Sequence, residues 1–192
     1  MIWCQENIKK RWHNWVFSDE CRFELYDIRG RKWAKTVLEV GVQKFGPSLV
    51  ILGGISIKGN SKLIFVEGTE NSDKYQKILA KAEPSLRAMH RLNFIFQQDG
   101  APCHRSISIS DWFRSSNWIV SSWPANSPDL NPIENLWALI KIKIRKIRHK
   151  TIDELKENIQ KVWDDILTES AKSLIQSMTD RLQTCIELQG KK

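Results

Sequence analysis

LNFIFQQDG, residues 92–100, is a nearly continuous apolar run that ends at an Asp-Gly dipeptide. A short run of this kind is typical of a strand that is buried on both faces of a sheet, and Asp-Gly favours a turn. The run follows a helical pattern that starts at Ser72 and meets a stop signal at Pro84. A buried strand that comes after a helix predicts an α/β crossover, and therefore a chain of the α/β class.

The region before that helix is predicted to be an antiparallel meander. Residues that favour strands form four short runs, at 15–18, 22–25, 49–57 and 63–66. The pair Gly53-Gly54 and the sequence KGN at 58–60 are expected to supply the turns between them.

The last part of the chain is predicted to be mainly helical. A helix at 107–114, a short strand at 118–120 and a loop at 122–128 come first, followed by three helices. The second of the three is expected to start behind Thr151 as its cap, and the third to run from Leu174 to a closing Gly190.

The first of these three helices has an ambiguous pattern. Residues 140–144 read IKIKI and alternate as a strand does, whereas apolar residues at helical spacing form a stripe at Leu136, Ile140, Ile144 and Ile147. Asn131 as an N-cap, with Pro132 in the first turn, decides for a helix.

Composition limits the class of protein. The chain has 192 residues, of which 41% are apolar and 27% charged, and this fits one folded domain with appendages. Its longest apolar run is shorter than the roughly 20 residues of a membrane helix. The first residues lack the pattern of a secretory signal, so an intracellular protein without a membrane segment is expected. Four scattered cysteines predict reduced thiols rather than a zinc module or disulfides.

Two other features of the composition are the net charge, which bears on the binding partner, and the tryptophans, which bear on the core. The excess of 30 Lys and Arg over 22 Asp and Glu gives a formal charge of +8. Such a charge favours a polyanion such as nucleic acid, but it is equally compatible with a basic protein that binds none. Most of the tryptophans, Trp33 among them, are interleaved with apolar periodicity and are interpreted as core rather than as stacking platforms for bases.

Three acidic residues stand out by their positions. Asp19 comes just after the first strand run, Asp99 ends the buried strand, and Glu134 opens the helix after Pro132. Each also has a purely structural explanation: Asp19 as a solvated strand end, Asp99 as a turn residue, and Glu134 as the N3 partner of Asn131 in a capping box. Taken singly, the structural explanations are at least as good as the functional ones.

The sequence around these acids resembles the catalytic domain of the Tc1-like transposases in the Tc1/mariner group. The resemblance spans about residues 12–190. It rests on five motifs in order: FSDE at 17–20, GGIS at 53–56, FVEGTENS at 65–72, QQDGAPCH at 97–104 and WPANSPDLNPIENLW at 123–137.

The resemblance implies a fold and a domain organisation. The family has an Asp, Asp, Glu triad with 34 residues between the last two acids, and positions 100 to 133 between Asp99 and Glu134 number 34. The implied fold is the RNase H-like one of transposase and integrase catalytic cores, a mixed sheet flanked by helices with a helical C-terminal part. Residues 1–192 would form one such domain, and the family's N-terminal helix-turn-helix region, which recognises transposon ends, is expected to be absent.

The resemblance also implies chemistry. Asp19, Asp99 and Glu134 would be the catalytic residues and would hold two Mg²⁺ ions, with Mn²⁺ as a substitute. Asp19 would bridge the ions and Glu134 would complete the second ion's shell. Carboxylate oxygens suit these hard cations. The implied reaction is the cleavage of transposon ends and the joining of the freed 3′-hydroxyl to a TA target.

Two further groups of residues are candidates for contacts with DNA. A run of cations follows the start of the last acid's helix and predicts a track for phosphates, with a solvated helix face as the alternative: Lys141, Lys143, Arg145, Lys146 and Arg148. His104 is predicted to have a structural or phosphate-contact role, and a metal ligand or general base is its alternative.

By the same resemblance, the partner is DNA, the active complex is a homodimer, and the location is the nucleus. The alternative function is a catalytically inactive derivative, truncated or domesticated, that binds nucleic acid or partner subunits through the same fold.

Overall fold

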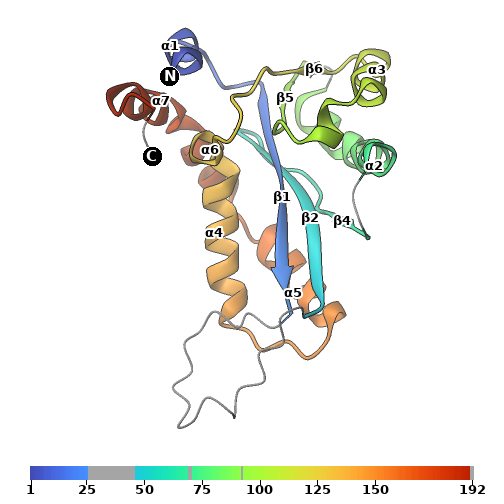
Figure 1. Cartoon of the computed structure of the whole chain (residues 1–192). Helices are drawn as coiled ribbons and strands as arrows, with labels where there is room; N and C mark the ends of the chain where they lie inside the picture. The colour runs from blue at the N-terminus through green and yellow to red at the C-terminus, as the bar shows by residue number, and fades with distance from the viewer. Residues whose placement is uncertain (26–45, 69–70, 92, 191–192) are drawn as a thin grey trace, which may run out of the picture.

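The computed structural model describes residues 1–25, 46–68, 71–91 and 93–190, and at its centre lies a mixed sheet with helices on both faces (Figure 1). The strands are β1 (Trp15–Glu24), β2 (Ser48–Ser56), β3 (Gly59–Asn60), β4 (Ile64–Val66), β5 (Ile95–Gln97) and β6 (Ile119–Val120). Their order across the sheet is β3-β2-β1-β5-β6, and β4 pairs with β2.

Strand β1 joins the antiparallel and the parallel halves of the sheet. It pairs antiparallel with β2, where Phe17 lies opposite Ile55, and parallel with β5, where Phe17 lies opposite Gln97. β5 in turn pairs parallel with β6. The antiparallel first part and the α/β crossover into β5 are therefore both confirmed.

The helices cover the two faces of the sheet and enclose two cores. They are α1 (Ile2–Asn7), α2 (Ser72–His90), α3 (Ile107–Ser115), α4 (Pro132–Arg145), α5 (Ile152–Asp164), α6 (Thr168–Gln176) and α7 (Met178–Glu187), with short 3₁₀ turns η2 (Pro102–Arg105) and η3 (Pro128–Leu130). Because strand side chains alternate, Trp15 and Phe17 enter the core beneath α4 to α7, while Val16 enters the core beneath α2 and α3.

The predicted helix starts depend on local side chains, and two of them are confirmed. Asn131 Oδ1 accepts a hydrogen bond from the Ile133 amide at 3.4 Å, and Thr151 Oγ1 accepts one from the Glu154 amide at 3.2 Å. For α2 the cap is one residue earlier than Ser72, because it is the Asn71 side chain that accepts from the Lys74 amide.

The prediction that Gly53 and Gly54 form a turn is wrong, because both lie inside β2. Asp19 is likewise inside β1, opposite Gly53, rather than just after a strand. A methyl group on Gly53 would lie 2.8 Å from the ring carbons of both Trp137 and Trp163. Glycine is needed here because two tryptophans press on the sheet, and not because the chain turns.

The stop predicted at Pro84 is also wrong, because α2 continues to His90. Proline costs a helix one hydrogen bond and some strain. Beyond it, Leu86 and His90 are both buried, at 2% and 5% exposure. Burial of this last part of α2 against the sheet outweighs the local cost of the proline.

The C-terminal helices differ from the prediction in number and extent. The third predicted helix is two helices, α6 and α7, which break at Ser177, and both contribute buried residues, Ile175 from α6 and Met178 from α7. The helix α1 was not predicted at all, and it packs against α7 with Cys4 Sγ 3.0 Å from Cys185 Sγ. Cys4, Cys21, Cys103 and Cys185 are all free cysteines in the structure.

α4 ends before Ile147, which is 39% exposed and so does not extend the apolar stripe. Leu92 and Trp33 lie outside the described residues. Within the ranges described, no helix combines the length and apolar character that crossing a membrane requires.

Candidate active site

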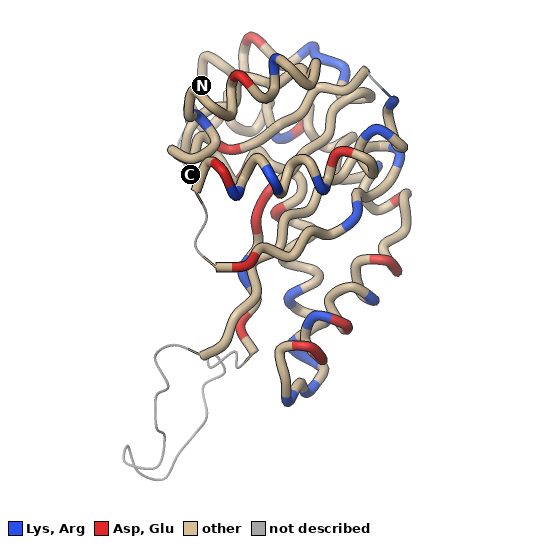
Figure 2. The backbone as a smooth tube through the Cα atoms, turned by 90° about the vertical axis from the view of Figure 1, so that its right-hand side faces the viewer, with Lys and Arg blue, Asp and Glu red and all other residues tan. Residues whose placement is uncertain are grey.

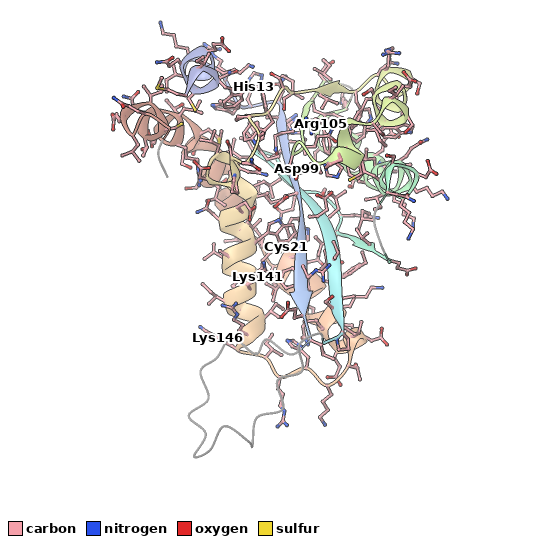
Figure 3. The ribbon with its side chains drawn as sticks, in the orientation of Figure 1. His13, Cys21, Asp99, Arg105, Lys141 and Lys146 are labelled. Carbon is pink, nitrogen blue, oxygen red and sulfur yellow. The ribbon has the colours of Figure 1, made fainter. Side chains whose placement is uncertain are left out.

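The three predicted acids line one cavity of about 380 Å³. Asp19 comes from the middle of β1, Asp99 lies just beyond the end of β5, and Glu134 lies in the first turn of α4. Figure 3 shows Asp99 beside the upper part of β1. Residues far apart in sequence therefore meet because β1 and β5 are neighbours in the sheet.

The start of α4 is fastened to β1 beside Asp19. The Asn131 side chain donates a hydrogen bond from Nδ2 to the carbonyl oxygen of Ser18 at 3.2 Å, and both residues are buried. The same amide caps α4 through its oxygen. One side chain thus starts the helix and places Glu134 at the cavity, which the sequence alone did not indicate beyond the capping role.

The capping-box explanation of Glu134 is not supported by the geometry. A capping box needs the glutamate side chain to accept from the backbone amide of the N-cap residue. The Asn131 amide instead donates to the Pro128 carbonyl at 3.0 Å. Glu134 lines the cavity with Asp19 and Asp99.

The electrostatic environment of Asp19 is unfavourable to a charged carboxylate. Burial, followed by the negative charges of Glu134 and Glu20, raises the pKa of Asp19 to about 8. Over the part of the chain that the structure describes, no three His, Cys, Asp or Glu side chains converge closely enough to hold a metal ion as they stand. The three acids therefore share a cavity and repel one another across it.

The cavity nevertheless suits a hard cation. Its ionisable donors are carboxylates, and Mg²⁺ and Mn²⁺ take oxygen ligands of this kind. A cation between Asp19 and Glu134 would also relieve the repulsion that raises the pKa of Asp19. Asp19, Asp99 and Glu134 are thus the residues of this cavity whose chemistry fits a divalent metal.

Asp99 has a turn role and a site role together. Its Oδ1 accepts hydrogen bonds from the Ala101 amide at 3.0 Å and from His104 Nδ1 at 2.6 Å. The hydrogen bond from His104, with help from the Ala101 amide, lowers the pKa of Asp99 below its ordinary value. Asp99 is therefore an ionised carboxylate that the following turn holds at the mouth of the cavity.

His104 lies behind Asp99 rather than on the surface. The residue is 4% exposed, and its ring stacks on Tyr75 with the centroids 3.8 Å apart. A buried, stacked ring favours the structural role over direct contact with a phosphate. It is also absent from the residues that line the cavity.

The basic run after the helix start divides into two parts. Lys141 is half-buried and lies over the Phe23 ring, 5.7 Å from its centroid, so it faces the sheet. Lys143, Arg145, Lys146 and Arg148 are exposed. Figure 3 shows Lys146 at the lower end of α4, and twelve residues of helix put it about 18 Å from Glu134 along the axis.

The rest of the molecule has a mixed distribution of charge. Figure 2 shows basic and acidic residues interspersed along most of the backbone, so the net charge of +8 does not belong to α4 alone. The exposed part of the run remains a candidate contact for phosphates because no acid interrupts it in sequence.

The cavity has one wall that the sequence did not reveal. The loop 123–128 and the side chain of Gln97 line it together with the acids. Gln97 Oε1 accepts a hydrogen bond from the Ser18 amide at 3.2 Å, and the Ser18 hydroxyl donates to the Gln97 carbonyl at 2.6 Å. The QQDGAPCH and WPANSPDLNP motifs contained these residues, but their meeting depends on the pairing of β1 with β5.

Asp19 predicts how stability depends on pH when no divalent metal is added. An unfolded aspartate has a pKa near 3.9, whereas the folded value is about 8. Between these values the folded protein holds one more proton than the unfolded chain, so the free energy of unfolding falls as pH rises, by at most about 1.4 kcal/mol per pH unit. We expect the Tm of wild type in EDTA to fall relative to that of Asp19→Asn between pH 5 and pH 8, because the variant lacks this component. Parallel Tm profiles of the two proteins would contradict this.

Comparison with known proteins places the chain in a family. The sequence pattern of the family described as DDE superfamily endonuclease matches residues 14–156. The Tc3 transposase of Caenorhabditis elegans is 36% identical over 97% of this chain, and the Tcb2 transposase of Caenorhabditis briggsae is 31% identical over 95%. The chain spans 59% of the length of the first and 70% of the second.

Solved structures agree with the expected fold. The Mos1 transposase paired-end complex with left transposon end is similar over 99% of this chain and 60% of its own, with a TM-score of 0.83 and 22% identity. The catalytic domain of Mos1 mariner transposase is similar over 100% of this chain and 90% of its own, with a TM-score of 0.80 and 19% identity. The RNase H-like fold is thereby confirmed, and the chain belongs to the DDE superfamily endonucleases, among the Tc1-like transposases.

Proposed function

We propose that this chain is a transposase catalytic domain that cuts DNA at transposon ends and joins the freed 3′-hydroxyl to a TA target. The observation that supports the proposal most is the meeting of Asp19, Asp99 and Glu134 at one cavity from three separate elements. Phosphodiester displacement needs charge stabilisation on both sides of the phosphate, and converging carboxylates that hold cations suit this need.

The metal in this proposal is Mg²⁺ or Mn²⁺, bound as two ions by Asp19, Asp99 and Glu134. Two of the similar Mos1 structures are paired end complexes with Mn and with Mg. When bound, such ions polarise the phosphate and lower the pKa of a coordinated water or hydroxyl. The protein contributes rigidity, since Asp19 is fixed by β1, Asp99 by its turn, and Glu134 by the fastened start of α4.

The proposal is tested with the 192-residue chain and two DNA substrates, a supercoiled plasmid and a duplex with a free 3′-hydroxyl. We expect nicking of the plasmid and joining of the duplex with Mg²⁺ or Mn²⁺, and neither with EDTA. Equal nicking with EDTA would contradict the proposal. DNA binding without any metal-dependent cleavage would favour the inactive derivative instead.

The proposed partner is DNA, and the proposed active form is a homodimer in the nucleus, where chromosomal targets lie. Several similar Mos1 structures are paired-end complexes or a strand transfer complex. A dimer would bring two transposon ends together, and a cation track on each subunit would extend the contact with the duplex.

Salt dependence of DNA binding tests the exposed part of the basic run. Each lost phosphate contact lowers the slope of log affinity against log salt by about 0.9. The double substitution Lys143→Gln and Lys146→Gln is therefore expected to reduce the slope by about 1.8 if both residues contact phosphates. Fluorescence anisotropy with a labelled duplex from low to moderate salt gives the slope.

A matched control uses two exposed lysines on the opposite face of the sheet. Lys77→Gln with Lys81→Gln on α2 removes the same charge, and both residues are exposed. We expect an unchanged slope for this variant. Equal slopes in wild type and in both double variants would mean that the basic run on α4 is a solvated helix face.

A further inference from the structure

The turn that follows Asp99 holds one oxygen of its carboxylate with two donors. Oδ1 accepts from the Ala101 amide at 3.0 Å and from His104 Nδ1 at 2.6 Å. An ionised carboxylate can only accept, so Nδ1 is the protonated ring nitrogen in this contact. Because the two donors act on the same oxygen, they define the rotation of the carboxylate about its Cβ–Cγ bond.

The side chain of Asp99 is nevertheless open to the cavity. Its exposure is 54%, compared with 3% for the His104 side chain. Asp99 lines the cavity and His104 does not. The histidine is therefore placed behind the aspartate, and the oxygen that His104 does not hold is left for whatever the cavity binds.

His104 is itself held firmly from two sides. Its ring stacks on Tyr75 of α2, with an angle of 25° between the planes. Its carbonyl oxygen accepts from Gln98 Nε2 at 3.1 Å, and Gln98 Oε1 accepts from the Tyr75 hydroxyl at 2.7 Å. Tyr75, Gln98 and His104 form a closed ring of contacts, and Asp99 is joined to it through His104. We call these four residues the aspartate clamp. All except Asp99 are buried.

The aspartate clamp also lies next to β1, beside Asp19. His104 Nε2 lies 3.8 Å from Glu20 Oε1, and Glu20 follows Asp19 in the strand. This distance is too long for a hydrogen bond, but it places a carboxylate next to the ring edge that faces away from Asp99. The ring is thus bounded by an acid at each nitrogen and by an aromatic face.

We propose that His104 is a positioning residue, which fixes the direction in which Asp99 presents its free carboxylate oxygen to the divalent metal. This inference rests on the proposed function. Metal-ligating groups are commonly oriented by a hydrogen bond from a residue behind them, and loss of that partner typically weakens metal affinity or activity about 10- to 100-fold. His104 is neither a ligand nor a general base here, because Nδ1 is engaged by Asp99 and the ring does not reach the cavity.

The substitutions His104→Asn and His104→Gln introduce the same amide group at different distances from the backbone. They distinguish a role of His104 in orienting Asp99 from a role in filling space. In His104→Asn the amide nitrogen is as many bonds from Cα as Nδ1 is, so it can donate to Asp99. In His104→Gln the amide is one bond further out and cannot take the same place. We expect Mn²⁺ affinity within about threefold of wild type for His104→Asn, and a loss of about 10- to 100-fold for His104→Gln and His104→Ala.

The affinity is measured on the 192-residue chain without DNA, by calorimetric titration with MnCl₂ and by the Mn²⁺-dependent shift in Tm. Cleavage activity is measured separately. The control is His90→Ala, which removes an equally buried imidazole, at 5% exposure, that does not line the cavity. It should lower the Tm in EDTA and leave the Mn²⁺ affinity unchanged.

The outcomes distinguish this inference from the function on which it rests. If wild type binds Mn²⁺ and His104→Gln binds it equally well, the positioning role is wrong while the metal site stands. If His104→Ala does not fold, the comparison of Asn with Gln still decides. If wild type itself does not respond to Mn²⁺, the proposed function fails and the positioning role with it.

Discussion

Asp19→Asn is expected to reduce metal-dependent cleavage and strand transfer by more than about 100-fold. Asparagine keeps the shape of aspartate but removes the charge of a proposed ligand that β1 fixes at the cavity. Loss of such a ligand misplaces the reacting oxygens, and a displacement of about 1 Å can cost 100-fold in rate. Plasmid nicking and joining of a 3′-hydroxyl duplex at saturating Mn²⁺ measure the effect.

The same change should not weaken the fold when metal is withheld. Burial, Glu134 and Glu20 together disfavour the charged form of Asp19, so a permanently neutral amide removes the cost of protonating this carboxylate on folding. We expect the Tm of Asp19→Asn in EDTA to equal or exceed that of wild type. Glu24→Gln is the control, because Glu24 is an exposed acid at the end of the same strand, outside the cavity.

All three acids should act as one metal site. Metal that binds only the folded protein stabilises wild type by about 2.7 kcal/mol at one hundred times its Kd. Asp19→Asn, Asp99→Asn and Glu134→Gln should each lose most of this gain, whereas Glu24→Gln should keep it. An equal Mn²⁺-induced rise in Tm in all five proteins would show that the acids do not form one site.

Trp163→Ala is expected to lower the free energy of unfolding by about 3–5 kcal/mol. The indole of Trp163 is 1% exposed, stacks on Trp137 with the centroids 5.2 Å apart, and donates from Nε1 to the Ser61 carbonyl at 2.8 Å. Removing it leaves a large cavity beneath α5 and an unpaired carbonyl. Urea denaturation followed by circular dichroism gives the difference.

The control for this change is Trp112→Ala on α3. Trp112 is only half-buried and belongs to the periphery of the other core. Its loss should cost clearly less than that of Trp163. Equal costs would mean that the stack of Trp163 on Trp137 does not hold α5 and α4 to the sheet.

The parts of the fold that the sequence predicted are those that depend on nearby residues. The cap at Asn131 starts α4 because the donor and acceptor are two residues apart. The apolar run before Asp99 became β5 because its composition alone favours burial. The helix stop predicted at Pro84 and the turn predicted at Gly53 were wrong because tertiary packing outweighs the local preference. At Pro84 the end of α2 is buried, and at Gly53 two tryptophans approach the strand.

The candidate site likewise has features that the sequence predicts and features that depend on packing. The positions of Asp19, Asp99 and Glu134 were predicted through motifs and a spacing of 34 residues, and the structure brings them to one cavity. The raised pKa of Asp19 and the aspartate clamp were not predicted, since burial and the stacking of His104 on Tyr75 exist only after α2 and β5 have packed. The pKa of an acid at the site thus depends on how the chain packs, whereas the identity of the acids can be predicted from the sequence.

The bond from Asn131 to Ser18 has a consequence for the order of events during synthesis. The two residues are 113 positions apart, and Glu134 follows Asn131 by three residues. At about 5–20 residues per second, a ribosome needs about 6–23 s to add the 115 residues from Asp19 to Glu134. For most of that interval the nascent chain carries only Asp19, and it carries two of the three acids only after Asp99 has been added. The set of three acids is therefore incomplete until Glu134 has been added.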